Sequence, residues 1–201
     1  MREARWELKG EFAAFVSHYK AEAAGDARQM KDRLSKLLEA PVFLDSDDLI
    51  DLRELLRIVA RSDVFVLLQT SNVLARPWCL LETYTAILNH VPIVAINVEG
   101  SFAYSYQETA ELLDSTKEEQ SFADRLASIN PGAVETIRKQ QVPVQGVFHD
   151  VNIEELGQAL ERHLPNLVRA PFFVLSFVGL IMCVRVQTKP PEPSLTGELC
   201  I

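Results

Sequence analysis

The stretch Asp63-Val64-Phe65-Val66-Leu67-Leu68-Gln69, followed after a short polar loop by Arg76-Pro77-Trp78-Cys79-Leu80-Leu81-Glu82, decides the fold. Its first half is a short apolar run of β-branched and aromatic residues, which is typical of a buried parallel strand. Its second half begins a helix, because proline is tolerated in the first turn, where its missing N–H has no partner. A strand, a loop and a helix in this order indicate an α/β protein.

The helical half also places two chemically distinct side chains together. Trp78 and Glu82 are four residues apart and therefore share one face of the helix. That face combines an aromatic plane with a single carboxylate near the carboxyl end of a strand, the side on which open α/β sheets bind ligands. The alternative interpretation is that Trp78 is a core anchor and Glu82 a solvated helix residue.

The alternation of strand and helix patterns continues along the chain. Strands are predicted at 12–17, 41–45, 63–69, 91–96 and 142–148. Helices are predicted from 26 with Asp26 as N-cap, at 52–59, 77–89, 108–113, 118–129, from 131, and at 153–164. This order predicts an α/β fold, a flavodoxin-like five-stranded parallel sheet in the order 2-1-3-4-5 with helices on both faces.

The composition divides the chain into four parts. We expect a polar lead-in over 1–10, one domain over 11–165, an apolar extension over 166–186 and a disordered tail over 187–201. Within the extension, the run 170–184 carries no charge but is shorter than the roughly 18 residues that span a bilayer as a helix. We expect this run to pack on the domain or on a partner; partial membrane insertion is the less favoured alternative.

Charge and cysteine content narrow the function classes. A net charge of −8 over 201 residues, with no stripe of Lys or Arg, argues against nucleic acid as the main partner. Cys79, Cys183 and Cys200 have no metal-ligand spacing and cannot all form disulfides with one another, so we expect a reducing, cytoplasmic location. The charged N-terminus predicts no signal peptide.

Metal and nucleotide motifs are sparse. The acidic group Asp45, Asp47 and Asp48 is interpreted as a solvated loop, and no metal site is predicted. The sequence contains no G-x-G-x-x-G, no phosphate-binding G-x-x-x-x-G-K-[ST], no G-x-S-x-G and no H-E-x-x-H motif. These absences argue against a dinucleotide redox enzyme, a P-loop protein, an α/β-hydrolase and a zinc protease.

Four pieces in order resemble the Toll/interleukin-1 receptor (TIR) domain family over about 11–165. Phe15-Val16-Ser17-His18 resembles the family's box 1, and 42–45 with the acidic loop after it resembles the second strand and BB loop. Ala60-Arg61-Ser62-Asp63 resembles the helix end before the third strand. Trp78-Cys79-Leu80-Leu81-Glu82 is similar to the W-C-L-x-E-L of plant immune TIR domains. Two departures are the lack of a glycine in 49–53 and of an acidic residue before Phe15.

The resemblance implies two possible functions in immune or stress signalling. One is cleavage of NAD+, a substrate rather than a cofactor, into nicotinamide and ADP-ribose or a cyclic product. Glu82 is then the expected catalytic residue, and the expected substrate-binding residues are Ser17, His18, Tyr19, Asp48 and Trp78. The other is a non-enzymatic adaptor or scaffold. Both imply self-association, which we expect through the loop 46–53 with its apolar Leu49 and Ile50, and contacts with other TIR domains.

Cleavage of NAD+ requires few catalytic groups. Nicotinamide leaves as a neutral heterocycle, so the reaction needs no general acid, unlike ordinary glycoside hydrolysis with its two carboxyl groups. One carboxylate can stabilise the oxocarbenium-like transition state, and an adjacent tryptophan can stack on the positively charged nicotinamide ring. The adaptor alternative treats Glu82 as a relic carboxylate.

Overall fold

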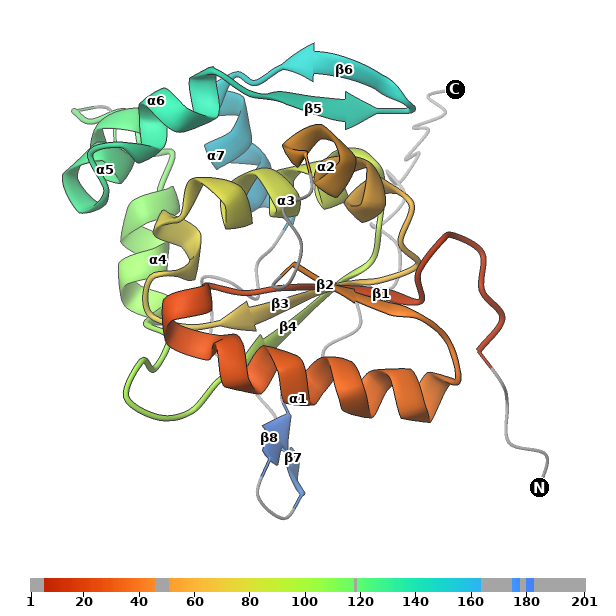
Figure 1. Cartoon of the computed structure of the whole chain (residues 1–201). Helices are drawn as coiled ribbons and strands as arrows, with labels where there is room; N and C mark the ends of the chain where they lie inside the picture. Colours follow the sequence, from red (N-terminus) through yellow and green to blue (C-terminus); the bar gives the residue numbers. More distant parts are fainter. Residues whose placement is uncertain (1–5, 46–50, 118, 164–174, 178–179, 183–201) are drawn as a thin grey trace, which may run out of the picture.

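A four-stranded parallel sheet forms the centre of the protein, as seen in the computed structural model of Figure 1, which describes residues 6–45, 51–117, 119–163, 175–177 and 180–182. The strand order is β2-β1-β3-β4. The strands are β1 (Ala14–Ser17), β2 (Val42–Leu44), β3 (Phe65–Gln69) and β4 (Ile93–Asn97). The parallel sheet and the first four positions of the predicted order are confirmed.

Helices cover both faces of this sheet, as predicted, because side chains alternate along each buried strand. Val16, Val66 and Leu68 face α1 (Lys20–Leu38), whereas Phe15 and Leu67 belong to the core that contains the other helices. The second layer contains α2 (Leu52–Ala60), the 3₁₀ turn η1 (Val73–Ala75), α3 (Pro77–Leu88), α4 (Tyr106–Leu113), α5 (Phe122–Ile129), α6 (Ala133–Arg138) and α7 (Ile153–His163). Figure 1 shows α1 alone on one face, with α2 and α3 on the other.

Helix α1 begins at Lys20, so the prediction that Asp26 caps its start is wrong. Asp26 is an exposed residue inside the helix. Residues 20–25 at its start include three alanines and a glycine, of which Ala23 is buried against the sheet, and these do not produce the leucine periodicity that marks the rest of the helix. The backbone at Ala23 is non-helical (φ −138°, ψ 21°), which records a kink between the first turn and the remainder.

The predicted fifth parallel strand is also wrong. Residues of that segment form an antiparallel hairpin, β5 (Gln141–Val144) and β6 (Val147–Asp150), and no fifth strand joins the parallel sheet within the described residues. Gln145 (φ 50°) and Gly146 (φ 86°) both have positive φ, as a two-residue type I′ turn requires. Asn89 after α3 donates to the Pro143 carbonyl (2.7 Å) and accepts from the Gln145 amide (3.2 Å).

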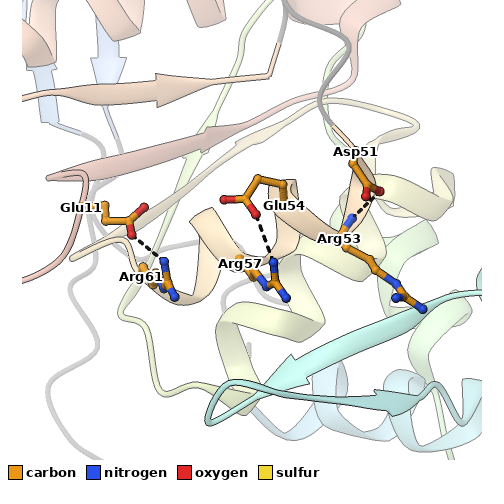
Figure 2. A network of polar contacts seen from close by, with 6 residues as sticks. All are labelled: Glu11, Asp51, Arg53, Glu54, Arg57 and Arg61. Atoms are coloured by element: carbon orange, nitrogen blue, oxygen red, sulfur yellow. Dashed lines mark hydrogen bonds and ion pairs between the residues drawn. The ribbon is translucent and has the colours of Figure 1, made fainter.

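Arginines of α2 secure this hairpin against the helix. The guanidinium carbons of Arg53 and Arg57 lie 5.5 and 5.1 Å from the centre of the Phe148 ring in β6. The exposed polar contacts along α2 are drawn in Figure 2: Arg57 with Glu54 (3.3 Å), Arg61 with Glu11 (2.7 Å), and the Arg53 amide with the Asp51 N-cap (3.2 Å). Exposed ion pairs stabilise little, so the ring contacts and the buried face of α2 hold the helix in place.

Part of the predicted polar lead-in docks at the amino end of β3. Asp63 accepts hydrogen bonds from Trp6 Nε1 (2.9 Å) and from the amides of Lys9 (3.0 Å) and Gly10 (2.6 Å). Partial burial opposes ionisation of Asp63, but these hydrogen bonds outweigh it and lower the pKa of its carboxyl. Gly10 is needed for this approach, since a Cβ at that position would lie 1.9 Å from the Arg61 carbonyl oxygen.

The apolar run 170–184 is described only in part. β7 (Leu175–Phe177) and β8 (Leu180–Met182) pair antiparallel, and the rest of the run, like the predicted tail 187–201, lies outside the described residues. Within the described part of the chain, no helix has both the length and the apolar character needed to cross a bilayer.

A matched pair of glycines tests the packing of α7 on α5. A Cβ at Gly157 in α7 would lie 2.6 Å from Cγ of the buried Phe122 ring, whereas a Cβ at Gly25 in α1 meets nothing within 4 Å. We expect Gly157→Ala to lower the free energy of unfolding by about 1–3 kcal/mol through overpacking. Gly25→Ala should raise it by about 0.5–1 kcal/mol, the usual helical gain. Urea unfolding measures both; a stabilised Gly157→Ala variant would contradict this packing.

Candidate functional site

A buried hydrogen bond joins the end of β1 to α3. Ser17, the last residue of β1, donates from Oγ to Oε2 of Glu82 in the second turn of α3, at 2.5 Å. Ser17 is 1% and Glu82 3% exposed. The interpretation of Glu82 as a solvated helix residue is therefore wrong, because its side chain is buried and bonded to Ser17 at the carboxyl end of β1.

Helix α3 can bury Glu82 because the helix is enclosed on nearly every side. All residues from Cys79 to Ala86 are buried, and they include three polar residues. The hydroxyls of Thr83 and Thr85 return hydrogen bonds to the carbonyls of Cys79 (2.6 Å) and Leu81 (2.7 Å). These three side chains are thus satisfied, the carboxyl by β1 and the two threonine hydroxyls by the helix itself.

Burial changes the protonation of Glu82. Loss of solvent raises the pKa of its carboxyl from 4.5 to about 8; the Ser17 hydrogen bond opposes this rise, and the negative charge of Asp45 adds to it. At neutral pH the free protein therefore holds Glu82 mainly as the neutral acid. Asp45 itself is half-buried, and burial raises the pKa of its carboxyl against the opposing charge of Lys20.

His18 and Cys79 pack beside this pair. Cys79 donates from Sγ to the His18 carbonyl at 3.4 Å, and burial raises the pKa of its thiol well above the usual range. His18 is 8% exposed, and burial, together with the charge of Lys20, lowers the pKa of its imidazole to about 4. The imidazole is therefore neutral at physiological pH. Its Nε2 has no hydrogen-bond partner among the described residues.

Trp78 and Tyr19 lie at the entrance to α3. Trp78 is 41% exposed, so the alternative that it is a core anchor is wrong. Tyr19, half-buried, carries the Arg76 guanidinium on its ring face, with 3.9 Å between Cζ and the ring centre. The structure thus places five of the six predicted site residues, namely Ser17, His18, Tyr19, Trp78 and Glu82, at the junction of β1 and α3.

The sixth predicted residue, Asp48, lies outside the described residues, as do Asp47, Leu49 and Ile50 of the predicted association loop. Sequence reasoning missed Arg76, whose only signal is its position directly before the Pro77 that starts the helix. Within the described ranges, no group of three or more His, Cys, Asp or Glu side chains is arranged to hold a metal ion.

No protein-family model matches this sequence, and no curated protein matches it either. The function must therefore be inferred from the residues of the site.

The raised pKa of Glu82 predicts a pH-dependent stability. The folded protein holds the Glu82 proton more tightly than the unfolded chain, so this stabilisation is complete below pH 4.5 and is lost as the pH rises toward about 8. The lowered pKa of His18 acts in the opposite direction between pH 4 and 6.5, which leaves pH 6.5–8 as the clean window. Between these values, the free energy of unfolding should fall more in the wild type than in Glu82→Gln.

Urea unfolding at several pH values measures this difference. Glu54→Gln removes a carboxyl that is 47% exposed on α2 and should keep the wild-type pH dependence. Parallel curves for the wild type and Glu82→Gln across this window would contradict a neutral buried Glu82.

Proposed function

We propose that this chain is a TIR-like NAD+ hydrolase with a flavodoxin-like fold, and that Glu82 is its catalytic carboxyl group. The single observation that carries the proposal is the Ser17–Glu82 hydrogen bond at the carboxyl end of β1, with Trp78 exposed one helical turn before Glu82. An aromatic face and one positioned carboxyl group are the two elements that cleavage of the nicotinamide–ribose bond requires. The products are nicotinamide and ADP-ribose or its cyclic form.

The positive charge of the substrate favours the ionised form of Glu82, which is mainly neutral in the free protein. A nicotinamide cation near Glu82 favours the ionised carboxyl, which offsets part of the desolvation that raises its pKa. Glu82 is 3% exposed in the free protein, so catalysis requires that substrate binding bring the ionised carboxylate into contact with the ribose carbon on which positive charge develops as the glycosidic bond breaks. Departing nicotinamide is neutral and takes no proton from the protein; water then bonds to the ribose carbon and releases one proton to give ADP-ribose, or an adenine nitrogen bonds there to give the cyclic product. The Ser17 hydroxyl keeps the carboxylate in place by donating to Oε2.

Trp78 suits the binding of the nicotinamide ring. Its exposed indole can stack on a cationic heterocycle without loss of core packing, and it lies on the same face of α3 as Glu82. His18 is neutral and therefore adds no positive charge that would repel the substrate cation.

The second candidate function is a non-enzymatic TIR scaffold, and one observation favours it. A 3% exposed, neutral Glu82 bonded to Ser17 can act simply as a link between β1 and α3. Assembly through 46–53, contacts with other TIR domains and a cytoplasmic role in immune or stress signalling belong to both candidates.

Loss of the Glu82 charge tests the enzymatic proposal. Glu82→Gln keeps the size and can still accept from Ser17, but it cannot become negative. We expect NAD+ cleavage, measured as nicotinamide release by chromatography, to fall by about 100-fold or more. The wild-type kcat/KM should rise with pH up to about 8, because the free enzyme must lose the Glu82 proton.

Glu54→Gln on the exposed side of α2 is the matched control and should retain full activity. If concentrated wild-type protein releases no nicotinamide from NAD+, the scaffold function replaces the enzymatic one.

Trp78→Ala separates stacking from structure. Because the indole is 41% exposed, we expect the free energy of unfolding to fall by no more than about 1 kcal/mol. The KM for NAD+ should rise by about 10-fold, the scale of a lost cation–π contact, and Trp78→Phe should recover part of it. A large drop in the melting temperature of Trp78→Ala, with unchanged KM, would show that Trp78 serves packing alone.

A further inference from the structure

Among the buried side-chain atoms that lack a hydrogen-bond partner within the described residues, two are nitrogen atoms of the residues directly after the end of β1 and directly before the start of α3. They are Nε of Arg76 and Nε2 of His18. Buried polar atoms in folded proteins almost always have a partner, so an unpaired donor marks a place for water or for a ligand. His18 directly follows β1 and Arg76 directly precedes α3, near the carboxyl ends of the strands, where parallel sheets bind ligands.

The Arg76 side chain is held in a defined position. Its guanidinium lies on the Tyr19 ring at 3.9 Å, a cation–π contact that leaves the edge of the guanidinium available for hydrogen bonds. Its backbone is also fixed, because its amide donates to the Val73 carbonyl (3.3 Å) and its carbonyl accepts from the Leu80 amide (3.0 Å). A cation held in advance loses little entropy when it binds an anion.

Arg76 is the N-cap residue of α3 and stands six positions before Glu82 in the chain. At the helical rise of 1.5 Å per residue, the backbones of the two residues are about 9 Å apart along the helix axis. In NAD+ a single ribose separates the scissile bond, which Glu82 is proposed to serve, from the diphosphate. A guanidinium is the side chain best matched to phosphate oxygens, because its planar donors can form two parallel hydrogen bonds.

We propose that Arg76, positioned by Tyr19, binds the diphosphate of the substrate, an inference that rests on the proposed function. Arg76 is then the residue that selects a dinucleotide over a nicotinamide riboside without phosphate. The need for such a cation follows from the net charge of −8, since an acidic protein repels an anionic ligand unless local positive charge compensates. His18 is neutral, and in the tautomer that carries its proton on Nε2 this atom can donate to a neighbouring phosphate or ribose oxygen.

Binding of ADP-ribose tests this inference without any need for catalysis. ADP-ribose contains the diphosphate and lacks nicotinamide; adenosine lacks the diphosphate and serves as the uncharged comparison ligand. In isothermal titration calorimetry at low salt, we expect Arg76→Gln to weaken ADP-ribose binding by about 10-fold or more and to leave adenosine binding unchanged. Tyr19→Leu, which removes the ring beneath the guanidinium, should weaken ADP-ribose binding by a smaller factor.

Arg57→Gln is the matched control. It removes the same charge from another arginine that lies on an aromatic ring, that of Phe148, and it should bind ADP-ribose like the wild type. Arg76→Lys keeps the charge but not the planar donors and should recover part of the affinity. Circular dichroism in urea establishes that each variant is folded at the temperature of the titration.

Two results would overturn the inference: folded Arg76→Gln that binds ADP-ribose as tightly as the wild type, or wild-type protein that binds ADP-ribose no more tightly than adenosine. Failure of the proposed function is a different result. It appears as Arg76-dependent binding of ADP-ribose by a wild-type protein that releases no nicotinamide from NAD+.

Discussion

The burial of one carboxyl group against one hydroxyl governs the proposed chemistry of this protein. Removing Glu82 from water keeps it protonated at neutral pH, and the Ser17 hydrogen bond only partly opposes that effect. The same bond ties the central strand β1 to the helix α3, so the proposed catalytic group is also part of the connection between the two layers. A cationic substrate is the natural complement of such a carboxyl, because the cation favours its ionisation.

The amino and carboxyl ends of the parallel strands differ in how far their buried polar groups are hydrogen bonded. At the amino end of β3, the Asp63 carboxylate accepts from the Trp6 indole and from the amides of Lys9 and Gly10. At the carboxyl end, His18 and Arg76 retain buried nitrogen atoms without a partner among the described residues. The satisfied end serves stability, and the unsatisfied end is where the ligand site is proposed.

Prediction from sequence succeeded where local pattern and burial agree. The apolar run at 63–69 and the helix starting at Pro77 are both present in the structure, and four strands occur near their predicted positions. Prediction failed at 142–148, where Gln145 and Gly146 adopt positive φ and turn the chain back. It also failed at Asp26, because the alanine-rich residues 20–25 at the start of α1 lack the leucine periodicity that indicates a helix. Both failures arise because tertiary packing selected between local conformations that periodicity alone does not distinguish.

The sequence by itself determined the α/β class, the parallel sheet and the spacing that puts Trp78 and Glu82 on one helical face, because these follow from periodicities of two and 3.6 residues. Only the tertiary structure decided that Glu82 is buried and Trp78 exposed, that Ser17 is the partner of Glu82, and that Tyr19 carries Arg76. Ser17 and Glu82 are 65 positions apart in the chain, and no local pattern specifies such a contact. Their meeting depends on how β1, β3 and α3 pack, and that packing sets the electrostatics of the site.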